Sequence, residues 1–299
     1  AKIIGELPEK GSMKVGSKNI KNTIIPYIFI APNMILFLVF VILPLIYNLY
    51  ISGTDWNIIS TPTWVGLQNY ITIFHDPVFY KSLLVTFTLI ILTVPIGLFG
   101  SLLLAVLLNN KIKGLPFFRS VLYMPAIISS VVVGMLFMWM FNSEYGIING
   151  WLNALGKDSV LWFNNKMLAI IPVALASIWM KLGYNMVIYL AAIQSISPSY
   201  YEAAQIDGAS RFKMFCYITF PLLKKTHIFL LITSIINTFR AFDIIYVMTG
   251  GGPQNSTTTI VLYIYRKAFE VGKMGEASAI GIVLFILIAG ITLVQLFLT

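Results

Sequence analysis

The chain has 299 residues, of which 58% are hydrophobic and 10% are charged, and its formal net charge is +9. Soluble domains carry about 25% charged residues, so this composition excludes an ordinary water-soluble protein and indicates an integral membrane protein. The single cysteine, Cys216, excludes an internal disulfide and a metal site built from several cysteines. Basic loops beside anionic lipid account for the positive charge, so we expect no nucleic-acid partner.

Six stretches are apolar and long enough to cross a bilayer, which requires a helix of about 20 residues. They predict an all-α membrane protein whose single domain, residues 24–299, has spans at Ile24–Tyr50, Leu83–Leu108, Val121–Phe141, Met167–Ile193, Thr226–Met248 and Ala277–Leu298. Pro95, Pro125 and Pro172 fall inside the second, third and fourth spans. Each should remove one backbone hydrogen bond and favour a kink.

The first 23 residues are polar and lack the apolar core and small-residue cleavage site of a secretory signal. We therefore expect the first helix to be retained behind an N-terminal tail. The sequence GSM at residues 11–13 is typical of a cloning junction, in which case residues 1–12 are a tag remnant.

Basic residues predict the orientation, because Lys and Arg are retained on the cytoplasmic side. One side carries six of them in its three loops, and the other side carries twelve, namely Lys2, Lys10, Lys14, Lys18, Lys21, Lys111, Lys113, Arg119, Arg211, Lys213, Lys224 and Lys225. With six spans, both termini are expected in the cytoplasm. The opposite loops contain Trp56, Trp64, Trp151 and Trp162, which fit either interfacial aromatics or a docking surface for an extracytoplasmic partner.

One polar segment, residues 194–225, interrupts the hydrophobic sequence on the predicted cytoplasmic side. Pro198 followed by Ser199 and Glu202 predicts a capped helix start, Gly208 predicts its end, and a second helix should run until Pro221. Ala203 and Ala204 have little side-chain bulk, so another surface could approach closely. The segment could insert into a groove of a partner or lie on the inner leaflet with its basic residues on lipid phosphates.

Few charged residues fall inside the predicted spans, and such residues are default candidates for function. Arg240 and Asp243 are three residues apart and could neutralise each other on one helical face, whereas Lys181 could extend to the membrane surface. The same helix offers hydroxyl and amide groups for a sugar, with positions 234, 238 and 241 on one stripe. Polar residues that hold helices together would give the same pattern.

The polar segment resembles a known signature. EAA, three residues, Gly, nine residues, Ile, one residue, an apolar residue and Pro match Glu202 to Pro221, with Phe220 where Leu is usual. This pattern is similar to the EAA motif in permease subunits of binding-protein-dependent ABC importers. The stretches WVGLQNY, LPFFRSVLYMP, LGYNMVIYLAAIQSI and AFDIIYVMTGGGPQNSTTTIVLYIYRKAF resemble sugar permeases of the maltose-permease type in the same order. The resemblance covers nearly the whole chain after Lys21.

This resemblance implies a type I importer permease in a bacterial or archaeal cytoplasmic membrane, paired with a second permease, two ATPase subunits and an extracytoplasmic binding protein. The chain lacks a GxxxxGK[ST] motif, so ATP and Mg²⁺ would bind the ATPases, and the chain needs no cofactor and is no enzyme by itself. Coupling to the ATPase would use Glu202, Ala203, Ala204, Asp207, Gly208 and Arg211. The sugar pathway would use Gly183, Met186, Ser234, Asn237, Thr238, Arg240 and Ala241.

Two other classes of membrane protein compete. A self-sufficient secondary transporter or channel would normally need carboxylates within its helices, and only Asp243 is available. An intramembrane enzyme would need paired carboxylates, an HExxH helix or a cluster of Cys and His, and the spans offer none of these. Within the importer class, a non-sugar substrate such as a glycerol phosphate ester is the alternative to a sugar.

Overall fold

The computed structural model of the protein describes residues 20–109 and 113–298. The first 19 residues of the predicted tail, which include the predicted tag remnant at 1–12, and Lys111 lie outside these residues. The chain divides into two compact units, residues 1–48 and 49–299, which are described separately.

The first unit is helical in all its described residues. It consists of α1 (Ile20–Phe37), the π-helix η1 (Leu38–Ile42) and the first six residues of α2 (Leu43–Ser52). No residue from 26 to 48 is buried within the chain, although this stretch is strongly apolar. A helix that is hydrophobic on all sides is suited to lipid or to a neighbouring membrane helix.

The second unit is a helical bundle with a hairpin of two short strands. Strand β1 (Thr54–Asp55) pairs antiparallel with β2 (Thr63–Trp64), a feature that the sequence did not indicate. The helices that follow are α3 (Gln68–His75), α4 (Pro77–Leu108), α5 (Leu115–Tyr123), η2 (Met124–Ala126), α6 (Ser130–Met140), α7 (Ile147–Ala154) and α8 (Ile170–Gln194). They continue with α9 (Pro198–Ile206), α10 (Arg211–Met214), η3 (Phe215–Thr219), α11 (Phe220–Leu222), α12 (Lys224–Phe239), α13 (Asp243–Thr249), α14 (Ile260–Tyr265), η4 (Arg266–Glu270) and α15 (Met274–Leu298).

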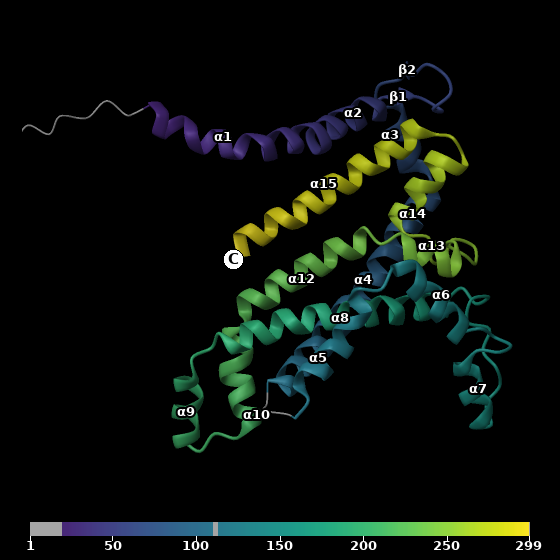
Figure 1. Ribbon diagram of the computed structural model, residues 1–299. Coiled ribbons are helices and arrows are strands. Elements are labelled where there is room, and N and C mark those ends of the chain that lie inside the picture. Colours follow the sequence, from purple (N-terminus) through teal and green to yellow (C-terminus); the bar gives the residue numbers. More distant parts are fainter. Residues whose placement is uncertain (1–19, 110–112, 299) are drawn as a thin grey trace, which may run out of the picture. The chain divides into compact units, whose positions relative to one another are not determined.

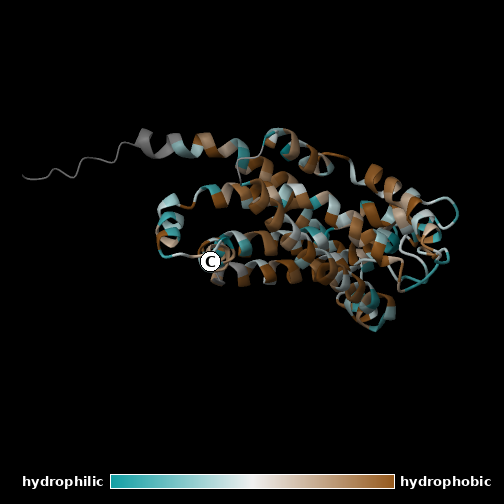
Figure 2. Ribbon diagram, turned by 90° about the horizontal axis from the view of Figure 1, so that it is seen from below, coloured by the Kyte–Doolittle hydropathy of each residue, from teal (hydrophilic) through white to brown (hydrophobic). Residues whose placement is uncertain are grey.

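Helix α4 is central to the second unit because it packs against α8, α12 and α14. Buried apolar side chains form three clusters, one around α6, α8 and α13, one around α3, α14 and α15, and one between α4, α8 and the start of α12. Hydrophobic residues run along the long helices and hydrophilic residues gather at the ends of the bundle (Figure 2). Figure 1 shows α9 and α10 at one end, away from α7 and α13.

Four helices are long and apolar enough to cross a membrane, and two bent pairs raise this number to six in the described residues if each pair is one span. One bent pair corresponds to the third predicted span and bends by 92° between Ala126 and Ser130. The other joins Arg211–Leu222, from the predicted polar segment, to the helix of the fifth predicted span, with a bend of 66° at Leu223. The fifth span also ends at Phe239, not at Met248 as predicted, because the chain leaves the helix before α13 begins.

The prolines have different effects from one another. Helix α4 continues as one helix through Pro95, and Pro125 lies in η2 beside the 92° bend. Pro172 is the third residue of α8. The N–H groups of a first helical turn have no partner within the helix, so the prediction that Pro172 removes a hydrogen bond is wrong.

A cluster of charged residues joins three elements at the end of the bundle that carries α3. Lys267 lies 3.2 Å from Asp76 and 2.7 Å from Glu276, and Lys273 lies 2.6 Å from Glu276. Tyr263 donates a hydrogen bond to Asp76. Burial raises the pKa of Asp76, but the hydrogen bonds from Tyr263, the Val78 amide and Lys267 outweigh it and hold this pKa below 3.8. We call these five residues, Asp76, Tyr263, Lys267, Lys273 and Glu276, the charged cluster.

Candidate functional site

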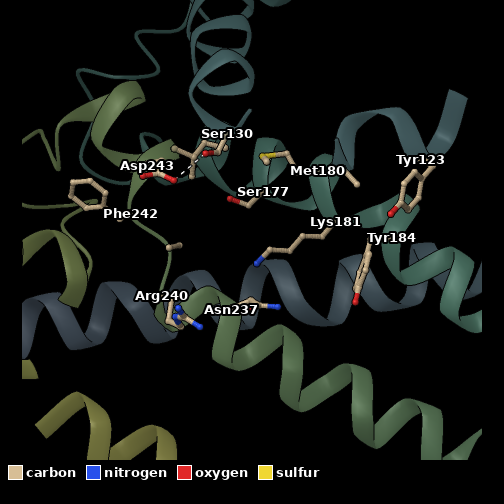
Figure 3. A pocket seen from close by; sticks show the side chains of 13 residues that line it. Tyr123, Ser130, Ser177, Met180, Lys181, Tyr184, Asn237, Arg240, Phe242 and Asp243 are labelled. Atoms are coloured by element: carbon tan, nitrogen blue, oxygen red, sulfur yellow. Dashed lines mark hydrogen bonds between the residues drawn. The ribbon is translucent and has the colours of Figure 1, made fainter. Parts of the chain in front are cut away.

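A cavity of about 310 Å³ lies where two interrupted helices meet α8. One interruption separates η2 from α6 and the other separates α12 from α13. Figure 3 shows side chains from all these elements around the space. The cavity is lined by Tyr123, Ala126, Ser130, Ser177, Met180, Lys181, Tyr184, Asn237, Arg240, Ala241, Phe242, Asp243 and Ile244.

The interruption after α12 is stabilised by a side chain from a distant part of the chain. Arg240 ends the helix, and Phe242 has φ −132° and ψ −63°, which is outside the helical range. The hydroxyl of Thr259 donates to the carbonyl of Ala241 at 3.2 Å. Non-helical backbone at membrane depth is tolerated where it is buried in protein or lines a polar cavity, and interrupted helices are typical of transport sites.

The charged residues of the cavity have different partners from those that the sequence suggested. Asp243 accepts a hydrogen bond from the hydroxyl of Ser130 at 3.1 Å, and Arg240 and Asp243 form no ion pair. The predicted neutralisation is therefore wrong, because the helix ends between the two residues. Lys181 donates to Thr238 Oγ1 at 3.2 Å, so its amine is directed at α12 inside the chain and not outward along α8, as the sequence suggested.

Aromatic rings extend one wall of the cavity along α13. The ring of Phe242 stacks on Tyr246, with 5.3 Å between centroids, and lies 5.0 Å from the ring of Tyr265. Tyr265 in turn lies 5.3 Å from Phe269. These contacts join α13 to α14 and η4 and place flat apolar faces beside the polar groups of the cavity.

The predicted pathway residues fall into three groups. Asn237, Arg240 and Ala241 line the cavity, whereas Ser234 and Thr238 line a much smaller neighbouring space of about 10 Å³ that shares Ser177 and Lys181 with it. The two cavities therefore meet at the lysine. Positions 234, 238 and 241 do not share one helical stripe, because residue 241 follows the helix end.

The structure does not bring Gly183 and Met186 to the cavity. A Cβ atom at Gly183 would lie 2.0 Å from the carbonyl oxygen of Leu122, so this glycine allows α8 to contact α5. Met186 is fully buried in the cluster between α4, α8 and α12. Sequence reasoning missed Tyr123, Ser130, Ser177, Met180, Tyr184 and Phe242, and the only signal for any of them was a nearby charge in a predicted span.

The polar segment folds as helix, turn and helix, as predicted. The turn is a Schellman motif, in which Gly208 N–H donates to Gln205 O at 3.1 Å and Ala209 N–H donates to Ala204 O at 2.9 Å. Gly208 has φ +72°, which only glycine adopts without strain. Ser210 is the N-cap of the second helix, and its hydroxyl accepts from the Lys213 amide at 3.4 Å. We call residues 198–222 the EAA segment.

Two details of the EAA segment differ from the prediction. The helix starts two residues earlier, since Ser197 is its N-cap and Ser199 lies inside it, with 2.8 Å between the two hydroxyl oxygens. No side chain caps α9, so the predicted capping box is absent there. Pro221 does not stop the second helix, because α11 continues to Leu222 and the bend follows at Leu223.

The EAA segment has an exposed tip and an anchored base. Glu202, Ala203, Asp207, Gly208 and Arg211 are exposed and Ala204 is half-buried, so all six predicted coupling residues lie together around the turn. At the base, the hydroxyls of Tyr201 and Thr219 are 2.9 Å apart.

A histidine that the sequence indicated only as a boundary residue fixes the bend at the base of the EAA segment. His227 Nε2 lies 3.1 Å from the Phe220 carbonyl and Nδ1 lies 3.0 Å from the Tyr189 hydroxyl. Since a carbonyl only accepts, Nε2 carries the hydrogen, and the neutral ring accepts from Tyr189. His227 therefore links α12 to both α11 and α8.

Comparison with known proteins agrees with this architecture. Residues 76–299 match the family described as the binding-protein-dependent transport system inner membrane component. The probable ABC transporter permease protein YurN of Bacillus subtilis is 36% identical over 281 residues, which cover 92% of this chain and 96% of that protein. The trehalose/maltose transport system permease protein MalF of Thermococcus litoralis is 35% identical over 271 residues, covering 90% and 92%.

A solved structure has the same fold. A chain of a bacterial alginate ABC transporter, crystallised with a periplasmic protein bound to an alginate pentasaccharide, superposes with a TM-score of 0.82. It is 28% identical, and the match covers 93% of this chain and 94% of that one. The interrupted helices, the apolar spans and these matches together identify the chain as a member of the binding-protein-dependent transport system inner membrane component family, the permease subunits of ABC importers.

Proposed function

We propose that the chain carries a saccharide across the membrane through the cavity between α8, α12 and the two helix interruptions. The observation that carries this proposal is the composition of the cavity wall, which combines hydroxyl and amide groups with the flat ring of Phe242. A saccharide needs hydrogen-bond partners for its hydroxyls and an apolar surface for its ring face. Relatives named for trehalose/maltose and for alginate transport support the same substrate class.

Within the pathway, Asn237, Arg240 and Ala241 would contact the substrate directly, because they line the cavity. Ser234 and Thr238 would act from the smaller space beside it, where Thr238 holds the amine of Lys181. Gly183 and Met186 would act through packing, by setting the position of α8 against its neighbours.

The EAA segment would be the contact with a cytoplasmic ATPase. Glu202, Ala203, Ala204, Asp207, Gly208 and Arg211 surround its tip, and the neighbouring Ile206 side chain is 87% exposed. An exposed apolar residue beside two alanines suits insertion into a cleft of another protein. Tyr201 links the two helices of the segment, and His227 joins the base of the segment to α8 and α12, so movement of the tip would reach both spans.

This role requires partners and an orientation. The EAA segment and both termini would face the cytoplasm, and the transporter would include a second permease and two ATPases that bind ATP and Mg²⁺. An extracytoplasmic binding protein would deliver the saccharide to the opposite end, where Trp64 is 68% exposed and Trp151 is 64% exposed.

Reconstitution tests the proposal. Uptake of labelled oligosaccharides into proteoliposomes should require this chain, a second permease, the ATPase, the binding protein and ATP. Uptake driven by an ion gradient with this chain alone would contradict it.

Two variants of the EAA segment test the coupling role. Glu202→Lys and Gly208→Asp should abolish ATP-driven uptake while the protein remains in the membrane, because the altered side chains project from the docking tip. Gly66→Asp is a matched control, since Gly66 also has positive φ (+63°) and open space around it. Equal uptake by Gly66→Asp and Gly208→Asp would return the segment to a lipid-surface role.

A further inference from the structure

The cavity carries an excess of positive charge. Lys181 and Arg240 both line it, and Asp243 is its only lining carboxylate. In Figure 3 the Asp243 carboxylate is directed at Ser130, while Lys181, Asn237 and Arg240 lie on the other side of the space. Among the residues that the structure describes, neither Lys181 nor Arg240 forms an ion pair.

The position of Lys181 makes this excess costly for a protein without a matching ligand. Lys181 lies near the middle of the 25-residue α8, and its amine has one neutral partner, the Thr238 hydroxyl. A cation at the centre of a membrane span costs several kcal/mol unless an anion or water compensates it. A neutral sugar offers no such compensation, since its hydroxyls need only neutral hydrogen-bond partners.

The two cations are also chemically matched to an acidic group. Arg240 presents a planar guanidinium that can bind a carboxylate or sulfate through two parallel hydrogen bonds, and Lys181 adds a compact positive charge. Phe242 and the adjoining Tyr246 and Tyr265 rings provide an apolar surface next to them. The cavity of about 310 Å³ is at the lower end of the size range of small-molecule sites, about 300 to 1,000 Å³.

From this arrangement we infer that the transported saccharide is acidic, and that its anionic group passes between Lys181 and Arg240. The inference rests on the proposed sugar-carrying function and adds the charge of the substrate to it. Asp243, held by Ser130, stays apart from the two cations and leaves them available to the substrate.

The test compares matched substrates in proteoliposomes that contain the complete transporter. The probes are trigalacturonate, its carboxyl-reduced neutral counterpart, a sulfated trisaccharide and glycerol 3-phosphate. We expect ATP-driven uptake of a carboxylated or sulfated saccharide at least tenfold faster than that of the neutral one. The two acidic probes distinguish carboxylate from sulfate.

Variants separate the cavity from the selectivity of the binding protein. At saturating binding protein, Lys181→Met and Arg240→Gln should each lower uptake of the acidic probe at least tenfold. Lys181→Arg should keep most of it, and Arg240→Lys should keep more than Arg240→Gln but less than wild type, since an ammonium keeps the charge and loses the paired hydrogen bonds. Lys157→Met, which removes one exposed positive charge from an outer loop, should leave uptake within twofold of wild type. Copurification with the ATPase checks that each variant assembles.

The outcomes differ for the two proposals. If the neutral saccharide is carried as fast as the acidic one, or if Lys181→Met and Arg240→Gln both leave acidic uptake within twofold, the acidic substrate is excluded and sugar transport stands. If glycerol 3-phosphate is carried and every saccharide is refused, the sugar and this inference both fail. Equal transport of neutral and acidic saccharides would be expected if a carboxylate of the second permease neutralised Lys181 and Arg240.

Discussion

The charged cluster and the EAA segment differ in how completely the chain satisfies their side chains. In the charged cluster, Lys267 contacts two carboxylates from two other elements, and its side chain is 15% exposed. In the EAA segment, no residue of α9 is buried and Ile206 is 87% exposed. The charges of the cluster are therefore paired within the chain, whereas the EAA segment exposes apolar side chains that no other described part of the chain covers.

From this difference we expect the charged cluster to be rigid and the EAA segment, in its proposed coupling role, to act through another protein. The cluster joins the start of α4 to η4 and to the start of α15, so these elements should remain together when the transporter changes conformation. The EAA segment is held at its base, where His227 contacts the Phe220 carbonyl and Phe215 packs against the cluster between α4, α8 and α12. Substitutions in the cluster should therefore lower stability, and substitutions at the tip of the segment should lower coupling.

The largest expected effect is that of Lys267→Met on stability. The substitution keeps the length of the side chain but leaves Asp76 and Glu276 without their shared cation, and breaking a buried pair costs about 3 kcal/mol. Chemical unfolding of the purified protein in detergent measures this change. Lys273→Met is the matched control, because the Lys273 side chain is 52% exposed and its pair with Glu276 should contribute less than about 1 kcal/mol.

The pH dependence of the stability difference between wild type and Lys267→Met gives a second test of the ion pair. Asp76 has a pKa below its ordinary 3.8 in the folded protein, so its contribution is present above that value and is lost as the pH falls through the lowered pKa. Burial lowers the pKa of Lys267, but its bonds to Glu276, Tyr263 and Asp76 outweigh this and raise the pKa above 10.5. The difference between wild type and Lys267→Met should therefore be constant from about pH 5 to 9. A difference that vanishes at neutral pH would contradict the ion pair.

A smaller effect is expected at the turn of the EAA segment. Gly208→Ala forces an L-residue into the left-handed region, which costs about 1 kcal/mol, and nothing lies within 4 Å of the added Cβ. Faster hydrogen exchange of the Gly208 and Ala209 amides would measure it, because their bonds form the turn. Gly208→Asn is the control, since Asn tolerates this conformation better. Equal exchange in Gly208→Ala and wild type would show that positive φ is not needed there.

Much of this architecture follows from local sequence patterns. The apolar runs predicted the spans, and Gly208 predicted the turn, because length in hydrocarbon and positive φ are local requirements. The interruption at residues 240–242 was not predictable, since TFRAFD contains no Pro or Gly and the carbonyl of Ala241 is satisfied by the distant Thr259. The cavity depends on that interruption, so only three predicted pathway residues reach it.

Charge partners show the same limit. Arg240 and Asp243 have helical spacing but lie on either side of the interruption, whereas Lys267 and Asp76 are far apart in the sequence and form an ion pair. Spacing predicts partners only within one unbroken helix. His227 was noted only as a polar residue at a helix start, because its hydrogen bonds depend on the 66° bend beside it.

The smallest effect on stability is expected at the tip of the EAA segment, where one substitution should leave folding unchanged and weaken binding of the ATPase. Ile206→Ser should change the free energy of unfolding by less than about 0.5 kcal/mol, because the side chain is 87% exposed in the chain. Burial of an isoleucine in a partner is worth about 1.5 to 3 kcal/mol, so the same change should weaken binding of the ATPase at least about tenfold. Ile59→Ser is the matched control, since Ile59 is 95% exposed and lies in the loop between β1 and β2. Titration of the ATPase against the reconstituted permease measures both variants. Equal ATPase affinities for the two variants would show that Ile206 faces water in the assembled transporter. The surface of the EAA segment that contacts the ATPase would then have to lie at Ala203 and Ala204.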